Sequence, residues 1–183
     1  MKKSKLILLI IGIVLVIAGI TYAAYTWIIP NTMKITGSSE CFDVKYIKGK
    51  DIGSDNNVKT LMISDDYKGG LSSTLNISFN STCTIKNGKG TLYLNTDSST
   101  SSSLLESGTL KYQIMRYSTN LGSGVISSTG QQVIASNISL SSSNTITVYV
   151  WIDATGLSEE EVIALLDTKY KGSVSMKIES GDK

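Results

Sequence analysis

Apolar and polar residues alternate at a period of two in four separate stretches of this 183-residue chain. Successive side chains of a strand point to opposite faces of a sheet, so each stretch predicts a strand with one buried and one solvated face. The four stretches are 74–79, 110–115, 145–152 and 173–178. This periodicity predicts that the chain beyond residue 30 is built mainly from β-strands.

Shorter β-prone stretches and turn sequences fill the intervals between these strands. The shorter candidates are 33–36, 42–47, 58–63, 91–95 and 132–140, and turns are expected at 68–70, 86–90, 120–122 and 128–130. Glycine and asparagine at such points permit the backbone conformations that tight turns need. Eight or nine short strands in roughly 150 residues predict an all-β fold, an antiparallel β-sandwich that is jelly-roll-like.

One short helix is expected within this sandwich. Ser158 and Glu161 have the spacing of a capping box, and residues 159–161 place acidic side chains in the first turn, where the helix dipole favours them. The apolar face of this helix would consist of Val162, Ile163, Leu165 and Leu166. We expect that face to cover an end or an edge of the sandwich.

Residues 6–29 carry no charge and follow three lysines, which is typical of an N-terminal hydrophobic helix that enters a membrane. As a signal peptide, this segment would be cleaved after Ala23 or Ala24. As an anchor, its 24 residues would span a hydrocarbon core of about 30 Å. We favour cleavage, and both alternatives remain open. Either one makes 1–29 a leader that contacts the membrane through 6–29, at least before processing, and predicts an exported domain over 30–183.

The chain contains no histidine, which removes the catalytic arrangements and zinc sites that depend on that residue. Once Lys2, Lys3 and Lys5 are set aside, 14 of the 17 basic residues remain against 15 acidic ones. A domain so close to neutrality has no basic patch for a phosphate backbone, so we expect no binding of nucleic acid.

Carboxylates are the remaining candidates for catalysis or cation binding. Asp65, Asp66, Asp153 and residues 159–161 fit turn, strand-end and helix-capping positions. Residues 51–57 offer oxygen ligands at alternate positions, but they lack the glutamate that completes an EF-hand loop. We expect no enzyme activity, no metal site and no cofactor, and calcium at 51–57 stays an open alternative.

Cys41 and Cys83 form an even pair in a chain with an export segment, which predicts a disulfide. The bond would join the start of one strand candidate to the end of another and so fix one end of the sandwich. Closing the loop between the two cysteines would stabilise the fold by at most about 4 kcal/mol in the chain-entropy treatment. Two free thiols are the alternative.

The leader ends in GITYAAY at residues 19–25, and an apolar strand, a turn and a strand rich in asparagine follow within 61–80. In these features the chain resembles the TasA/camelysin family, which consists of exported fibre-forming proteins of the biofilm matrix in Gram-positive bacteria. The resemblance implies a jelly-roll fold, processing by a dedicated signal peptidase, and a place at the cell surface or in the extracellular matrix. The chain has no HExxH motif, so we do not expect the protease activity described for some camelysins.

The resemblance also implies assembly by donation of an N-terminal strand to the sheet of the next subunit. The segment after the cleavage site is apolar and β-prone, and it ends before Pro30. Its residues, the expected donor strand, are Tyr25, Thr26, Trp27, Ile28 and Ile29. Cleavage would leave this strand exposed at the mature N-terminus. We therefore expect a non-catalytic structural protein that can self-assemble into fibres.

A membrane-anchored adhesin or carbohydrate-binding module is the alternative. Tyr93, Tyr149 and Trp151 fall on the predicted solvent faces of their strands, where aromatic rings could form a platform for a ligand. Aromatic residues at such positions also serve as cross-strand packing partners. The sequence leaves these two interpretations open.

Overall fold

A computed structural model describes residues 42–47, 51–52, 59–60, 63–79, 87–141 and 143–180 of the chain. Several expectations concern other residues and lie outside this part: the leader, Ala23 and Ala24, the donor strand 25–29, the strand candidate 33–36, and both Cys41 and Cys83. The expected disulfide, the cleavage site and the donor strand therefore remain predictions.

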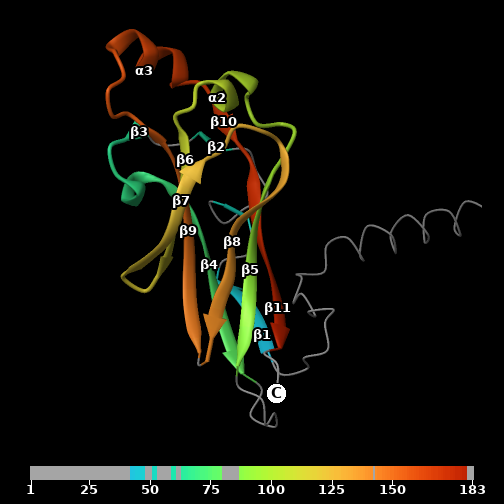
Figure 1. Cartoon of the computed structure of the whole chain (residues 1–183). Coiled ribbons are helices and arrows are strands. Elements are labelled where there is room, and N and C mark those ends of the chain that lie inside the picture. Colours follow the sequence, from blue (N-terminus) through green and yellow to red (C-terminus); the bar gives the residue numbers. More distant parts are fainter. Residues whose placement is uncertain are drawn as a thin grey trace, which may run out of the picture. The chain divides into compact units, whose positions relative to one another are not determined.

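The described strands form two main sheets that pack face to face (Figure 1), together with a short two-stranded sheet. The larger sheet has the order β1-β4-β9-β6-β7, and all of these neighbours are antiparallel. Its strands are β1 (Phe42–Ile47), β4 (Leu71–Phe79), β9 (Asn144–Asp153), β6 (Leu110–Arg116) and β7 (Thr119–Val125). The short β3 (Ile63–Ser64) pairs parallel with the end of β9.

The smaller sheet has the order β11-β5-β8, again antiparallel. Its strands are β11 (Gly172–Ser180), β5 (Gly88–Thr96) and β8 (Gly130–Leu140). Beside the start of β11, β2 (Lys59–Thr60) pairs with β10 (Lys169–Tyr170), and Asp51 makes an isolated antiparallel bridge to Ser173.

The strand pairs are nested in the sequence, because each pair lies between the two strands of the next pair outward. β6 pairs with β7, β5 with β8, and β4 with β9, while Asp51 pairs with Ser173 and β2 with β10. Antiparallel pairs nested in this way across two packed sheets make a jelly roll. The expected antiparallel sandwich is confirmed.

The inward residues of the four alternating stretches form the core, as the period-two pattern predicts. Leu75, Ile114, Ile146 and Val174 are each fully buried, with 0% of their surface exposed. The register places Leu75 opposite Ile146, so apolar residues of neighbouring strands face the same interior.

Three expectations about local structure are wrong. Of the turn expected at 86–90, residues 88–90 lie within β5. Residues 120–122 were expected to be a turn, but they lie within β7, and the chain reverses at Tyr117 and Ser118 instead. Tyr117 adopts a φ of 52°, a conformation that a bulky residue rarely takes and that sequence pattern does not reveal. The candidate 58–63 is described only at 59–60 and at Ile63, and these belong to two strands with different partners.

The described part contains two short α-helices, where one was expected, and a 3-10 turn. They are η1 (Tyr67–Gly69), α2 (Ser102–Glu106) and α3 (Glu159–Leu165). The capping box of α3 is confirmed: Glu161 N donates to Ser158 Oγ at 3.3 Å, and Ser158 N donates to Glu161 Oε2 at 2.7 Å. Among the described residues, no helix is long and apolar enough to cross a membrane.

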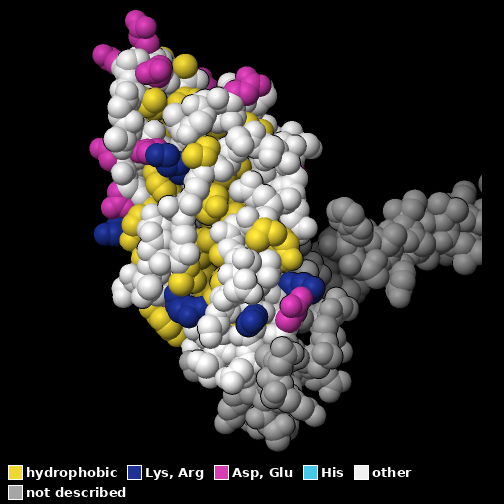
Figure 2. Space-filling model, viewed as in Figure 1, with side chains coloured by type: hydrophobic (Ala, Val, Ile, Leu, Met, Phe, Trp, Pro, Cys, Tyr) yellow, Lys and Arg dark blue, Asp and Glu magenta, His cyan; other side chains and the backbone are white. Residues whose placement is uncertain are grey.

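The expected apolar face of α3 covers the sandwich only in part. Leu165 is buried, whereas Ile163 and Leu166 have 59% and 53% of their surface exposed. Figure 2 shows acidic side chains at the end of the domain that carries α3, where residues 159–161 are exposed.

Candidate functional site

The outer face of the larger sheet combines aromatic rings with hydroxyl and amide side chains. Tyr149 and Trp151 alternate on β9 with residues that point into the core. Cross-strand pairing places Gln113 on one side of Tyr149 and Ser72 on the other, and Lys111 beside Trp151. Because these positions share one face of the pleat, their side chains are neighbours.

Tyr67 joins the two aromatic residues of β9 from the turn η1. Its ring centroid lies 5.0 Å from that of Tyr149 and 6.4 Å from that of Trp151, in edge-to-face geometry at both contacts. The Lys68 ammonium lies 5.9 Å from the centre of the Tyr67 ring. Such aromatic contacts each contribute about 0.5–1.5 kcal/mol beyond the area they bury. The turn therefore packs on the sheet through an aromatic cluster, Tyr67, Tyr149 and Trp151.

Trp151 is more buried than its place on the predicted solvent face implied. Only 6% of its surface is exposed, yet it does not belong to the hydrophobic core between the sheets. The approach of Gly70 explains this burial, because a Cβ at that position would lie 2.5 Å from the Val150 carbonyl oxygen and 2.9 Å from the Trp151 Cβ. The Trp151 Nε1 atom is buried and has no hydrogen-bond partner.

The third aromatic candidate, Tyr93, lies elsewhere. It belongs to β5 of the smaller sheet and is half-buried on that strand, so it does not join the aromatic cluster. Conversely, Tyr67 belongs to the cluster but was not predicted from the sequence, because it lies among turn residues outside any alternating stretch. The only sign of its role in the sequence is an aromatic residue placed directly before the 68–70 turn.

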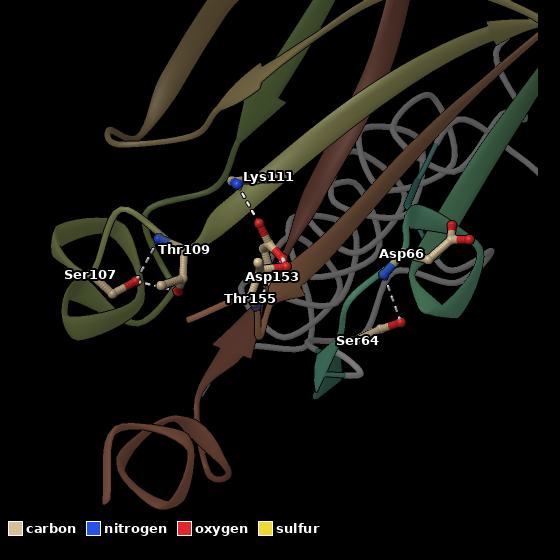
Figure 3. Close-up of polar contacts among 7 residues, drawn as sticks. All are labelled: Ser64, Asp66, Ser107, Thr109, Lys111, Asp153 and Thr155. Atoms are coloured by element: carbon tan, nitrogen blue, oxygen red, sulfur yellow. Dashed lines mark hydrogen bonds and ion pairs between the residues drawn. The ribbon is translucent and has the colours of Figure 1, made fainter. Parts of the chain in front are cut away.

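Lys111 and Asp153 form an ion pair (Figure 3). Because Lys111 lies opposite Trp151 in the register, this pair is next to the aromatic cluster. Asp153 Oδ2 accepts from Lys111 Nζ, while Oδ1 accepts from Thr155 N at 3.1 Å and from Thr155 Oγ1 at 2.7 Å. These bonds, chiefly the one from Lys111, hold the pKa of Asp153 below its ordinary value of 3.8. Asp153 is the last residue of β9, and its carboxylate links this strand to Lys111 of β6.

We expect Asp153→Asn to lower the free energy of unfolding by about 1 kcal/mol at neutral pH, because it removes a charged partner of Lys111. The folded carboxyl has the lower pKa, so its contribution is present above the unfolded value of 3.8 and disappears as pH falls through the folded pKa. The difference between wild type and variant should therefore shrink towards pH 2.5. Urea unfolding of both proteins between neutral pH and about pH 2.5 measures this difference, and Asp65→Asn, at an exposed position, is the control. A difference that grows in acid would contradict a stabilising ion pair between Lys111 and Asp153.

Two of the other carboxylate candidates have structural partners, whereas Asp65, Glu159 and Glu160 are exposed. Asp66 caps η1, where its Oδ1 accepts from Lys68 N at 2.8 Å, and Glu161 belongs to the capping box of α3. Figure 3 also shows Asp66 N donating to Ser64 Oγ, at 3.2 Å. The described residues contain no group of three side chains suited to hold a metal ion. Of the calcium candidate 51–57, the structure describes only residues 51–52.

A second candidate feature is the edge of β11. Pairing with the segment 51–52 covers only its first residues, through the Asp51–Ser173 bridge and a bond from Ile52 N to Gly172 O at 2.9 Å. Over 174–180, the described part of the chain pairs with β11 on one side only, through β5. This side of residues 174–180, which has no partner strand within the described part of the chain, is called the open edge of β11 below.

Comparison with known proteins assigns no family. No protein-family model and no curated protein match the sequence. Similar solved structures include the secreted serine protease VesC from Vibrio cholerae, with 10% identity over 80% of this chain and 25% of that chain and a TM-score of 0.30. A CBM51 from Clostridium perfringens GH95 in complex with methyl-galactose shows 15% identity over 74% of this chain and 93% of its own, with a TM-score of 0.29.

A family two carbohydrate esterase from Cellvibrio japonicus shows 6% identity over 77% of this chain and 34% of its own, with a TM-score of 0.27. The chain thus spans a quarter of the length of the protease and a third of that of the esterase. All three likenesses are too distant to assign an activity to this chain.

Proposed function

We propose that this chain is a non-catalytic, exported structural protein of the bacterial cell surface or extracellular matrix, related to the TasA/camelysin fibre proteins. Its subunits join when residues 25–29 of one copy add as a strand to the open edge of β11 in the next. The observation that supports this most is the one-sided pairing of 174–180 within the described residues. An exposed strand edge is a template for another strand, because its backbone donors and acceptors on that side lack a partner strand.

The dimensions of donor and acceptor agree. A strand rises about 3.3 Å per residue, so the open edge spans about 23 Å and the donor about 17 Å. Each backbone hydrogen bond contributes about 0.5–1.5 kcal/mol net, so several bonds along this length give useful affinity. The donor strand is uncharged, and it therefore meets no like charge on the edge.

The side chains of the open edge tolerate an added strand. Val174, Met176 and Ile178 point inward and are buried, so the edge is rigidly held by the core. On the outer face, Lys177 and Glu179 form an ion pair of 2.8 Å and compensate each other's charge. Charged side chains on an edge strand discourage unselective pairing, so we expect only a donor whose side chains fit beside this pair to add there.

The rest of the proposal follows from the leader. Residues 6–29 would hold the precursor in the membrane until cleavage after Ala23 or Ala24 frees the donor strand. The jelly-roll nesting of the described strands agrees with the fold that the family resemblance implies. N-terminal sequencing of the extracellular product should give a start at Ala24 or Tyr25.

We expect Ile28→Pro in the full chain to prevent fibre formation, because proline removes a backbone donor from the centre of the donor strand. The matched control is Ile28→Val, which keeps an N–H group and a β-branched side chain, and should assemble like the wild type. A variant that begins at Asn31 should fail like Ile28→Pro. Electron microscopy of equal protein amounts gives the fibre yields, and equal yields from all four proteins would refute the donor role.

A further inference from the structure

The aromatic cluster lies on the outer face of the larger sheet, away from the open edge of β11 in the smaller sheet. We propose that this face, centred on Tyr149 and Trp151, binds neutral carbohydrate. This function goes beyond strand donation and does not depend on it, because the two features use different sheets. A matrix subunit with such a face could bind polysaccharide while it is part of a fibre.

The cluster offers the apolar surface that a pyranose ring needs. Tyr149 is half-buried on the sheet, with Tyr67 edge-on at 5.0 Å, so part of the Tyr149 side chain remains in contact with solvent. Aromatic side chains present an apolar ring together with a polar group, and binding sites for small ligands combine such rings with a few placed polar groups. The aromatic cluster supplies the first of these requirements.

Polar side chains surround the cluster on the same face. Ser72 and Gln113 are the cross-strand neighbours of Tyr149, and both are partly accessible. Two register positions further along the same pair of strands, the hydroxyls of Thr74 and Thr147 lie 3.0 Å apart. Hydroxyl and amide groups both donate and accept hydrogen bonds, as the hydroxyls of a sugar do.

The indole of Trp151 adds an unused donor. Only 6% of the residue is exposed, and its Nε1 atom is buried without a hydrogen-bond partner. A buried donor without a partner destabilises a protein, so a group that supplies an acceptor there recovers free energy on binding. The turn η1 covers this donor through Tyr67 and Gly70, so a sugar hydroxyl reaches it only when the turn lifts from β9.

The charges around the cluster favour a neutral ligand. Lys111 and Asp153 compensate each other in their ion pair, and the Lys68 ammonium faces the Tyr67 ring. A carboxylated or phosphorylated sugar would therefore find no arginine fork at this face, because the only arginine, Arg116, donates to the Ser139 carbonyl oxygen at 3.0 Å. We infer that the ligand class is an uncharged oligosaccharide.

Tryptophan fluorescence tests this site directly. The chain has two tryptophans, so Trp27→Phe leaves Trp151 as the only one. The full chain with this substitution, kept in lauryldimethylamine oxide, would be titrated with cellohexaose, chitohexaose and β-1,4-galactohexaose. We expect at least one of these probes to change the Trp151 emission with a saturable curve. Each probe would be raised to about 10 mM, a concentration at which even a weak complex forms. If none of the three produced a saturable change, the proposal would be overturned.

Matched variants locate the binding, with calorimetry as the readout. Tyr149→Ala should weaken binding at least about tenfold, which is about 1.4 kcal/mol. The control Tyr93→Ala removes a comparable half-buried tyrosine from the other sheet, and its binding affinity should stay within about twofold of the wild-type value. Tyr149→Phe keeps the ring and should retain binding, which separates loss of the site from loss of the fold. Equal weakening by Tyr93→Ala and Tyr149→Ala, or none by either, would contradict a site at the aromatic cluster.

Discussion

The Leu75→Ala variant is expected to lose about 3 kcal/mol of its free energy of unfolding. Leu75 is fully buried in the centre of the larger sheet, where β4 lies between β1 and β9 and where it faces Ile146. Truncation removes the transfer free energy of the side chain and leaves a cavity, and such changes cost about 2–5 kcal/mol in protein cores. Urea unfolding followed by circular dichroism measures the loss.

Leu166→Ala is the matched control for this prediction. It is the same substitution at a residue with 53% of its surface exposed, at the end of α3, and it should change the free energy of unfolding by no more than about 0.5 kcal/mol. Similar losses in the two variants would show that Leu75 does not lie in the core of a sandwich with this register.

The Gly70→Ala variant is expected to be destabilised by about 2 kcal/mol and to shift the emission of Trp151 to longer wavelength. A Cβ at this position would meet the Val150 carbonyl oxygen at 2.5 Å, and a backbone atom cannot move aside as the end of a flexible side chain can. The turn η1 must then lift from β9, which admits water to the indole. Fluorescence in the Trp27→Phe background, together with urea unfolding, measures both effects.

Ser72→Ala serves as the control, because it changes a half-buried residue two positions further along the same side of β4 without adding a group that meets the backbone. It should leave the Trp151 emission unchanged. If Gly70→Ala also left the emission and the stability unchanged, the packing of η1 on Trp151 described above would be wrong.

The core could be predicted from the sequence because strand periodicity reports burial directly. Once Leu75, Ile77 and their equivalents alternate with polar residues, the inward face of each strand is determined. The helix α3 was also predictable, because its capping box depends only on residues three positions apart. Both signals are local, and the structure confirms both.

The aromatic cluster could be predicted only in part. Periodicity placed Tyr149 and Trp151 on the outer face of β9, but it gave no information about the turn that covers Trp151. That cover depends on Tyr67, which is more than 80 residues away in the chain, and on the close approach of Gly70 to Val150. Contacts of this range follow from tertiary packing and leave no periodic signal. The reversal at Tyr117 was missed for a related reason, since the surrounding structure holds that residue in a rare conformation.

Hydrogen exchange along β11 tests the proposed mode of assembly most directly. Fibres of the wild-type chain would be compared with the Ile28→Pro variant, which is expected to remain unassembled. The account predicts slower amide exchange over 174–180 in the fibres, with little change over 88–96 in β5, which already has strand partners on both sides. Fibres in which residues 174–180 exchange as fast as they do in the unassembled variant would contradict it.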